Sequence, residues 1–542
     1  MPGQDNHHHR PSPVDPDAGR QDRPHREGRA GRRGDPRRTH RLAGGIRSLV
    51  PATVPVAARP RERPHRNGND LRGSTMNMVM LPPRVRMWNR DGWYLYFDPH
   101  NFKWVRVNDS GHFILTRLQL YRTTEDIVSE IVERFGMTED IARTAVHQFV
   151  DDLSSVGFLH HDEYDEGERP TFGPRAFAHT VYMHLTNNCN LKCPYCYNKS
   201  DREYKIKMEK QGRIASILTT DESKALITRL VENGVKHLVF TGGEPLMRPD
   251  ALELFEHARS LSSTLKIEVL TNGILIKDAV AEKLCEFVNM VTISLDGHER
   301  HMHERYRGRN TFAPTIRGIR KLVEVRKRRG KPGPRISLVP ALTDKNIGFM
   351  KEIYEFALDD LGVDGLAPIL FQAGDHQELS IQQIPTLAEW GLAQNRTRDY
   401  LRGRTPQPVK TAPPSPVVPR NHCGVGEGEF SVDPAGFVYP CQTMHFDQFI
   451  CGNVRELDIK EIYDTSPVMR RVRTAVVDNL DVCRHCDVKY FCNGGCRSTA
   501  FNVYGEFEKH NELYCRHLEK LAVDRMWANC ELPLHATEGV CA

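Results

Sequence analysis

Hydrophobic and polar residues follow two different patterns in the N-terminal third of the chain. Between residues 78 and 107, short apolar and aromatic runs alternate with clusters of turn-forming residues, which is typical of β-strands and hairpins. The expected strands are Val79–Trp88, Trp93–Asp98 and Phe102–Val107, with turns at Asn89–Gly92 and Pro99–Asn101. A small sheet is therefore predicted at this position.

Helical periodicity replaces the strand pattern after residue 120. Thr123 followed by Asp126 predicts a capping box at a helix start. Apolar residues then recur every three or four positions, which is the spacing of one helix face. They are Ile127, Ile131 and Phe135, and later Val146, Phe149, Val150 and Leu153. Residues 76–165 are therefore expected to form an α+β domain with three strands and three helices.

Six apolar runs separated by helical stretches fill residues 175–405. Regular alternation of strand and helix predicts a parallel sheet with crossover helices, such as Asp221–Glu232. The expected strands are Val181–Leu185, Leu238–Thr241, Ile267–Thr271, Met290–Leu295, Ile336–Ala341 and Leu366–Phe371. Functional residues in such a sheet gather where the strands end.

Three cysteines follow the first of these strands at the spacing CxxxCxxC, namely Cys189, Cys193 and Cys196. A structural zinc ion is usually held by four ligands, whereas an iron–sulfur cluster held by three thiolates leaves one iron open to a small molecule. The spacing, with Tyr195 inside it, resembles the cluster motif of the radical S-adenosylmethionine (SAM) enzymes. The resemblance implies a [4Fe–4S] cluster whose open iron binds SAM, within a partial (β/α)6 TIM-type barrel.

A second motif supports this resemblance. Gly242, Gly243, Glu244 and Pro245 end the second expected strand and are similar to the GGEP element of the family. There the glycines let the backbone approach the methionyl part of SAM, and the acid accepts from its ammonium group. Glycine has no Cβ and suits a close approach, although the same four residues alone are typical of a turn at a strand end.

The resemblance also implies four further SAM contacts. Ser294 and Asp296 at the end of the fourth strand would contact SAM, Arg307 would bind its carboxylate, and Tyr195 would pack on its adenine. Small and acidic residues are also common where strands end, and an aromatic residue beside a cluster also excludes water. Both interpretations stay open here. No side chain is identified as a general base.

A second cysteine array follows a proline-rich linker at residues 406–420. It lies within residues 421–520, before a tail at 521–542, and matches the SPASM domain, which carries two auxiliary iron–sulfur clusters. The resemblance implies one auxiliary [4Fe–4S] cluster on Cys483, Cys486, Cys492 and Cys515, and another on Cys423, Cys441 and Cys496. The alternative is a pair of zinc sites.

The fourth ligand of the second auxiliary cluster is left open by the sequence. Relatives that close this site carry a cysteine just upstream of the first one, and this chain has none there. Either the site is open or Cys451, His422 or another residue closes it. Cys285, like Cys451, is expected to be an ordinary core residue, and Cys530 and Cys541 are unassigned.

Composition narrows the class of protein. Residues 1–75 hold 16 arginines and no lysine against eight acidic residues, a net charge of +8 that leaves −3 for residues 76–542. This segment is expected to be disordered, with Met76 or Met78 as the true start. Residues 76–542 are nearly neutral, which gives no support to nucleic-acid binding. The chain contains no run of about 18 apolar residues, so no membrane span is expected.

The 14 cysteines fall mostly in metal-ligand spacings, which favours a reducing, cytoplasmic location over a disulfide framework. The order of strands and helices over residues 76–165 resembles the winged-helix RiPP recognition element (PqqD-like), where RiPP denotes a ribosomally made, post-translationally modified peptide. In that family, a leader peptide adds to a sheet edge. A plain docking or dimerisation domain is the alternative.

Together, the resemblances imply a radical SAM/SPASM peptide maturase. Such an enzyme reductively cleaves SAM to a 5′-deoxyadenosyl radical and oxidatively crosslinks a precursor peptide through a thioether or C–C bond. Its expected partners are that peptide with its leader and an electron donor such as flavodoxin or ferredoxin. An anaerobic sulfatase maturase, which makes formylglycine, is the alternative enzyme. A non-catalytic peptide-binding or electron-transfer iron–sulfur protein is the alternative of another class.

Overall fold

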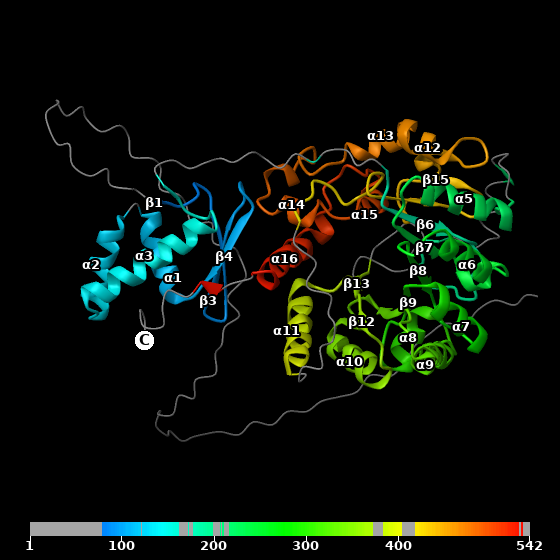
Figure 1. Ribbon diagram of the computed structural model, residues 1–542, viewed down its shortest axis with the longest axis horizontal. Coiled ribbons are helices and arrows are strands. Elements are labelled where there is room, and N and C mark those ends of the chain that lie inside the picture. The colour runs from blue at the N-terminus through cyan, green and yellow to red at the C-terminus, as the bar shows by residue number, and fades with distance from the viewer. Residues whose placement is uncertain are drawn as a thin grey trace, which may run out of the picture. The chain divides into compact units, whose positions relative to one another are not determined.

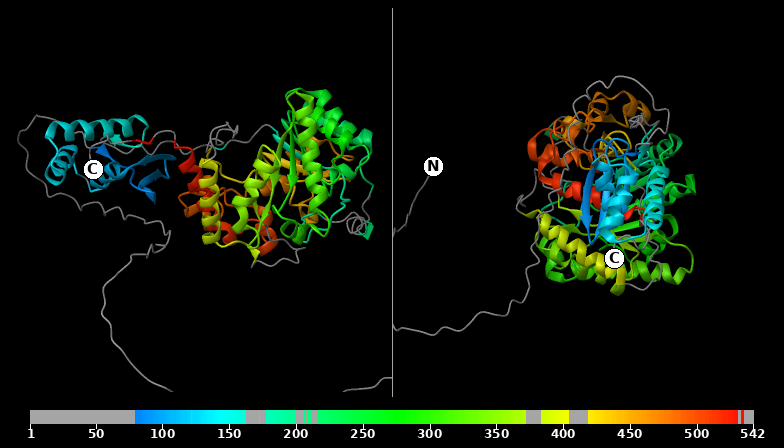
Figure 2. Two further views of the ribbon diagram at one scale, coloured as in Figure 1. Left: turned by 90° about the horizontal axis from the view of Figure 1, so that it is seen from below. Right: turned by 90° about the vertical axis from the view of Figure 1, so that its left-hand side faces the viewer.

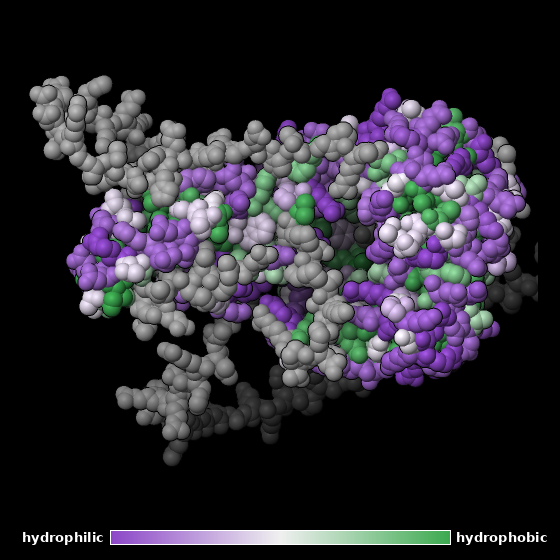
Figure 3. All heavy atoms as spheres, in the orientation of Figure 1, coloured by the Kyte–Doolittle hydropathy of each residue, from purple (hydrophilic) through white to green (hydrophobic). Residues whose placement is uncertain are grey.

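The computed structural model (Figure 1) describes residues 79–161 except 121, then 172, 177–198, 206, 209–210, 216–371, 383–403, 418–530 and 533–534. The expectations for the arginine-rich segment, the true start and Cys541 lie outside these residues, as does most of the proline-rich linker. No described helix is long and apolar enough to cross a membrane. Hydrophilic residues predominate on the barrel surface that Figure 3 shows.

The N-terminal domain contains a small sheet beside three helices. The strands are β1 (Val79–Met80), β2 (Arg86–Arg90), β3 (Trp93–Asp98), β4 (Lys103–Val107) and β5 (His160–His161). β2, β3 and β4 form an antiparallel meander, while β1 pairs with β5. The expected first strand is therefore wrong as one piece, because Pro82 and Pro83 interrupt it and proline cannot donate to a strand ladder.

The turns of the meander are tighter than expected. Strand β2 continues to Arg90, so the first turn is only Asp91–Gly92, and both residues have positive φ angles of 52° and 77°. A two-residue loop with this geometry matches the twist of a hairpin. Phe102 also has a positive φ of 56°, so it belongs to the second turn and β4 starts one residue later.

The helices of this domain follow the expected pattern. They are α1 (Asp109–Gln119), α2 (Thr124–Phe135) and α3 (Glu139–Ser155). The capping box is confirmed, since Asp126 N–H donates to Thr123 and Thr123 N–H donates to the Asp126 carboxylate. Ile127, Ile131 and the α3 stripe are buried, whereas Phe135 at the helix end is 37% exposed.

The central domain is built on the expected parallel sheet, in the strand order β12-β10-β9-β8-β7-β6. Its strands are β6 (Thr180–His184), β7 (His237–Thr241), β8 (Lys266–Thr271), β9 (Met290–Ser294), β10 (Arg335–Val339), β11 (Ala341–Leu342), β12 (Gly365–Leu366) and β13 (Ile369–Leu370). The fifth and sixth expected strands are each split, at Pro340 and at Pro368, and the two halves pair separately. The cause is again the missing proline N–H.

Helices connect these strands and cover the sheet (Figures 1 and 2). They are α5 (Thr220–Glu232), α6 (Ala251–Leu261), α7 (Asp278–Phe287), α8 (Arg300–Arg307), α9 (Phe312–Arg329), α10 (Met350–Glu355) and α11 (Leu387–Gly403), with short turns η1 (Pro245–Met247), η2 (Ile347–Phe349) and η3 (Phe356–Asp360). Apolar residues of the strands and helices form one large buried core, in which Cys285 lies as expected. The fold is the partial α/β barrel that the sequence predicts.

The cysteine-rich C-terminal region extends the same sheet, which the sequence did not indicate. Strand β14 (Glu429–Val432) pairs in parallel with β6, and β15 (Phe437–Tyr439) and β16 (Gly452–Asn453) continue antiparallel, giving nine strands. The remaining elements are η5 (Asp447–Phe449), α12 (Ile459–Thr465), α13 (Pro467–Arg473), η6 (Cys483–His485), α14 (Lys489–Cys492), α15 (Arg497–Tyr504), α16 (Glu512–Ala528) and β17 (Pro533–Leu534). The auxiliary cysteines are thus anchored to the barrel through β14.

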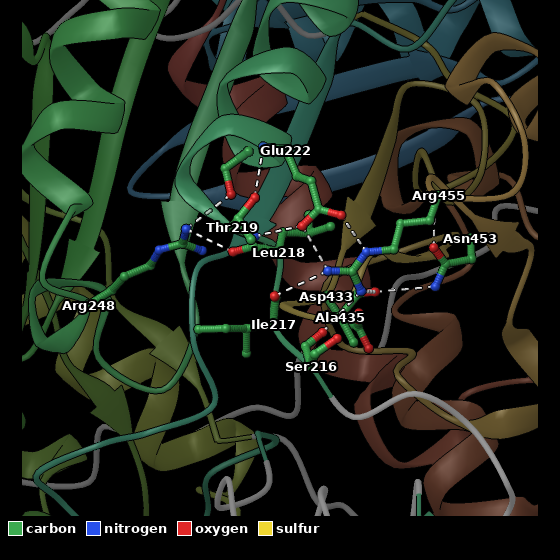
Figure 4. A network of polar contacts seen from close by, with 11 residues as sticks. Ser216, Ile217, Leu218, Thr219, Glu222, Arg248, Asp433, Ala435, Asn453 and Arg455 are labelled. Carbon is green, nitrogen blue, oxygen red and sulfur yellow. Dashed lines mark hydrogen bonds and ion pairs between the residues drawn. The ribbon is translucent and has the colours of Figure 1, made fainter.

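An arginine also fastens this region to the barrel. Arg455, just after β16, donates to both oxygens of Glu222 in the first turn of α5, at 2.7 and 2.8 Å, and to the carbonyls of Ser216 and Ile217 (Figure 4). Hydrogen bonding to Arg455 lowers the pKa of Glu222 to about 2. The start of α5 is therefore held by a residue more than 200 positions away.

The N-terminal sheet packs against the helices α14 and α16. The Phe97 and Phe491 rings meet edge to face at 5.4 Å, and Arg90 forms an ion pair with Asp524. The same hydrophobic cluster includes Cys486 and Cys492. The N-terminal domain is thereby attached to the elements that carry the last auxiliary cysteines.

Candidate iron–sulfur and SAM site

The loop after β6 brings the first three cysteines together. Cys196 N–H donates to the Cys193 carbonyl at 3.0 Å, which closes a tight turn, and Leu191 N–H donates to Cys189 Sγ at 3.4 Å. Burial raises the pKa of Cys189 to about 11 and of Cys193 to about 12, and the Cys196 thiol adds to both shifts. Cys193 and Cys196 therefore share one tight turn, while no group of three His, Cys, Asp or Glu side chains among the described residues is already arranged to hold a metal ion.

The turn after β7 lies directly against this loop. Gly243 N–H donates to the Thr186 carbonyl at 2.7 Å, and Glu244 N–H donates to the Asn188 carbonyl at 2.9 Å. A Cβ on Gly242 would lie 2.3 Å from the Thr186 oxygen, and one on Gly243 would lie 2.3 Å from the Asn188 oxygen. The family resemblance predicts that these glycines approach SAM. The structure shows that they are needed for an approach to the cysteine loop itself.

Glu244 turns its carboxylate toward the end of β8. It accepts from the Thr271 hydroxyl at 2.7 Å, from Asn272 N–H at 2.8 Å and from Leu246 N–H at 3.2 Å. Burial raises its pKa to about 7, although these hydrogen bonds act in the opposite direction. Pro245 then starts the short turn η1. The acid therefore links the ends of two neighbouring strands beside the cysteine loop.

Asp296, Arg307 and Tyr195 form one buried polar group. Arg307 donates to Asp296 through Nε at 2.7 Å and through its terminal nitrogen at 3.1 Å, and the Tyr195 hydroxyl also donates to Asp296. Burial alone would raise the pKa of Asp296, but the Arg307 guanidinium holds it below its ordinary value. The guanidinium also lies over the Tyr195 ring, 5.2 Å from its centre. Ser294 lies nearby in sequence, at the end of β9, and is partly exposed.

In the second cysteine array, thiols that the resemblance assigns to one cluster affect one another electrostatically. Cys423 precedes β14, Cys441 follows β15 and Cys496 caps α15, and the Cys496 thiol raises the pKa of both others beyond the effect of burial. In the other group, burial raises the pKa of Cys492 to about 12, and three neighbouring thiols add to it. They are Cys486, Cys483 and Cys515.

Arg497 lies between these two groups and was not anticipated. It is 2% exposed and donates to the carbonyls of Gly495, Phe507 and Lys509 at 3.3, 3.1 and 2.9 Å. Its charge lowers the pKa of both Cys423 and Cys483, against the larger effect of burial. An arginine next to a cysteine gives no distinctive signal in a sequence, so its role depends on the folded loop.

Two aromatic contacts connect the first cysteine loop with the Cys441 loop. The Tyr197 hydroxyl lies 3.5 Å from Gln442 Oε1, and the rings of His184 and His445 lie 4.4 Å apart. His184 is buried, and neither of its ring nitrogens has a hydrogen-bond partner among the described residues. The first and second cysteine groups are therefore neighbours across the junction of β6 and β14.

Comparison with known proteins agrees with this arrangement. Residues 183–356 match the radical SAM superfamily, residues 423–487 match the SPASM iron–sulfur cluster-binding domain, and residues 93–159 match coenzyme PQQ synthesis protein D (PqqD). These segments coincide with the barrel, the cysteine-rich region and the N-terminal domain.

Three relatives illustrate the range of similar proteins. AdoMet-dependent heme synthase of Oleidesulfovibrio alaskensis is 29% identical over 373 residues, covering 64% of this chain and 89% of the relative. Mycofactocin maturase MftC of Mycobacterium ulcerans is 28% identical over 329 residues, covering 58% and 82%. PqqA peptide cyclase of Bradyrhizobium diazoefficiens is 27% identical over 356 residues, covering 63% and 87%.

Proposed function

Because this chain is a radical SAM enzyme with a SPASM domain and a PqqD-like domain, we propose that it oxidatively crosslinks a ribosomally made precursor peptide. It binds SAM, a [4Fe–4S] cluster and auxiliary iron–sulfur clusters. The non-catalytic alternative is accordingly set aside. The peptide substrate and the type of bond, a thioether or a C–C bond, are our inference.

The PqqD-like domain is the observation that carries this proposal. It packs through Phe97 onto Phe491 of the SPASM region, so a peptide bound to it would be tethered beside the auxiliary clusters. Tethering through a short flexible segment raises the local peptide concentration to roughly millimolar. Two of the relatives are, by name, a maturase and a peptide cyclase.

Cys189, Cys193 and Cys196 are the proposed ligands of the SAM cluster, because three thiolates on one loop can bind three of its four irons. When bound, the cofactors supply a radical that removes a hydrogen atom from a substrate carbon and an acceptor for the electron that the substrate radical then loses. The chain's own residues must hold SAM and exclude water. Arg307 is the proposed partner of the SAM carboxylate, and Tyr195, which stacks beneath it, is the proposed adenine contact.

The remaining SAM contacts of Gly242, Gly243, Pro245 and Ser294 are proposed on the same grounds, with Glu244 as the acceptor for the ammonium group. Both oxygens of Glu244 and of Asp296 already accept from protein groups, but Asp296 differs because it is also ion-paired: it accepts from Arg307 as well as from Tyr195 and Ala341 N–H. Its proposed role is therefore to orient Arg307 and Tyr195 toward SAM. This departs from the direct contact that the family resemblance implied.

The experiment is an anaerobic reaction of the protein, SAM and a reductant with the precursor peptide encoded nearest its gene. A product that has lost the mass of two hydrogen atoms, in step with 5′-deoxyadenosine formation, is expected. The matched control is the same core peptide without its leader, which should react far more slowly. An unmodified precursor despite SAM cleavage would contradict the proposed substrate. Replacing the chemical reductant with flavodoxin or ferredoxin tests whether either protein can serve as the electron donor.

A second candidate is a reaction on a heme precursor, which the heme synthase relatives favour. A heme precursor needs no leader, so this candidate leaves the PqqD-like domain unexplained. Turnover of a heme precursor with SAM, unaffected by any peptide, would favour it over the peptide maturase. A sulfatase-derived cysteine peptide serves in the same assay as the probe for formylglycine formation, the remaining alternative.

A further inference from the structure

Cys423, Cys441 and Cys496 supply three thiolates to a group that needs a fourth ligand if every iron of a [4Fe–4S] cluster is to be held by the protein. Three residues of the cysteine-rich region are candidates for that ligand. They are Cys451, His422 and Glu429.

Cys451 lies in a different environment. Its thiol donates to the Phe449 carbonyl at 3.5 Å, and the side chain packs against the main hydrophobic core of the barrel. Burial raises its pKa to about 12, and the charged or polar neighbours that modify it are Ser466 and Arg473. No cysteine of the group is among the described neighbours that affect it. Cys451 is therefore better explained as a core residue.

His422 is adjacent to Cys423, but both of its ring nitrogens are engaged. Nδ1 accepts from Gly424 N–H at 2.8 Å, and Nε2 contacts the Glu427 carboxylate. An imidazole needs a free nitrogen lone pair to bind a metal. Binding iron through His422 would therefore break the Gly424 contact if Nδ1 were the ligand, or the Glu427 contact if Nε2 were.

Glu429 is aimed at the cysteine group. It is the first residue of β14, fixed opposite Thr180 of β6, and its Oε1 lies 3.6 Å from Cys441 Sγ. Glu429 and Cys423 also line the same cavity. Glu429 therefore contacts one cysteine of the group and shares a cavity with a second.

The space around Glu429 also fits a metal group. A cavity of about 370 Å³ is lined by Cys423, Glu427 and Glu429 together with His422 and Arg420. The Cys441 thiol donates to the Glu429 carboxylate, and the charge of Arg420, which lines the same cavity, also acts on that carboxylate. A buried carboxylate is costly unless positive charge compensates it, and carboxylates are established ligands of iron.

We propose that Glu429 is the fourth ligand of the auxiliary cluster held by Cys423, Cys441 and Cys496. The inference rests on the SPASM clusters assumed in the proposed function, but not on the peptide substrate. A carboxylate would make one iron of the cluster different from its three thiolate-bound neighbours. That difference is measurable without turnover.

The test uses full-length protein in which Cys189, Cys193 and Cys196 are replaced by Ala, so that only auxiliary clusters contribute. Mössbauer spectra of the ⁵⁷Fe-labelled protein should contain one iron subsite distinct from the others. Glu429→Gln should alter or abolish this subsite, and Glu429→Cys should convert it to the thiolate type. Cys451→Ser and Glu427→Gln are the matched controls and should leave the spectra of the parent unchanged.

Two outcomes would overturn the proposal. In one, the spectra of Glu429→Gln and Glu429→Cys superimpose on that of the parent; in the other, Cys451→Ser changes the distinct iron subsite. If Glu429→Gln loses the whole cluster, the Glu429→Cys spectrum still decides, because a cysteine at this position can replace the carboxylate ligand. Peptide modification is measured separately on protein with its first three cysteines intact. A protein that modifies no peptide yet shows the Glu429-dependent subsite would refute the proposed substrate and leave the ligand assignment standing.

Discussion

Arg307 and Asp296 form a two-point ion pair beneath the site proposed for SAM, with hydrogen bonds of 2.7 and 3.1 Å. Asp296 has no exposed surface, and the side chain of Arg307 is 11% exposed. The pair joins the end of β9 to the end of α8, and Ala341 N–H binds the same carboxylate from the next strand. A single acid thereby links the end of β9, the end of α8 and the start of β11, and it holds the cation above Tyr195.

Replacing Asp296 with Ala should therefore destabilise the protein strongly. Removing one partner of a buried ion pair leaves an uncompensated charge, which costs about 3–5 kcal/mol. The midpoint of thermal unfolding of the anaerobic protein should fall, and SAM binding should weaken in parallel. The control is Glu324→Gln, which breaks the exposed Lys321–Glu324 pair and should cost less than about 1 kcal/mol. Equal shifts in the two variants would contradict the role assigned to Asp296.

Gly243→Ala should remove the SAM cluster while sparing the auxiliary ones. The added methyl group would lie 2.3 Å from the Asn188 carbonyl, so the cysteine loop would have to move away from β7. The iron content of the protein should fall by the amount that one cluster contributes, and reductive SAM cleavage should be lost. Gly348→Ala is the matched control, since no atom lies within 4 Å of its new methyl group. Full iron content in Gly243→Ala would show that the loop tolerates the displacement.

Local signals predicted most of the fold. The capping box at Thr123, the apolar stripe of α3 and the parallel strands of the barrel depend on neighbouring residues, and each was expected at nearly its observed position. The strand errors occurred at Pro82, Pro340 and Pro368, where a continuous apolar run hides a missing N–H donor. These prolines were visible in the sequence and mark the observed breaks.

Long-range relationships escaped prediction. Pairing of β14 with β6 joins residues about 250 positions apart and anchors the β14–β15 hairpin, whose antiparallel register brings Glu429 beside Cys441. Arg497 and Arg455 likewise act on carbonyls and carboxylates brought to them by folding. Cysteine spacing identified the cluster ligands because iron–sulfur ligation constrains the sequence locally, whereas a lone glutamate at a strand start carries no such constraint.

The C-terminal strand β17 occupies one edge of the N-terminal sheet, where it would compete with a leader peptide that adds to the same edge. Its two residues, Pro533 and Leu534, pair in parallel with Arg106 and Val107 of β4. If the leader peptide adds to this edge, removal of residues 531–542 should strengthen leader binding. Without β17, the leader no longer has to displace about one hydrogen bond at this edge. That bond contributes roughly 1 kcal/mol net, so leader affinity should rise about fivefold. Fluorescence anisotropy with a labelled leader measures it.

The matched control for this prediction is a truncation that removes only residues 535–542 and keeps β17. It should bind the leader as the full chain does. Equal affinity in all three proteins would indicate that the leader uses the opposite edge, at β2, or another surface. Weaker binding after removal of residues 531–542 would mean that the tail supports the leader instead of competing with it.

Arg497→Met should disrupt both auxiliary groups at once. Methionine approximates the length of the arginine stem but offers no donor, so the carbonyls of Phe507 and Lys509 would lose their buried partners. Each unsatisfied group costs about 1–3 kcal/mol, and the loop that carries Cys492 and Cys496 depends on these bonds. Iron content should therefore fall toward that of the SAM cluster alone, while reductive SAM cleavage persists.

The control is Arg484→Met, which changes a half-exposed arginine in the same region; this variant should retain the iron content of the parent protein. Loss of iron from only one auxiliary group, resolved by Mössbauer spectroscopy, would show that Arg497 stabilises a single cluster and not the junction between two.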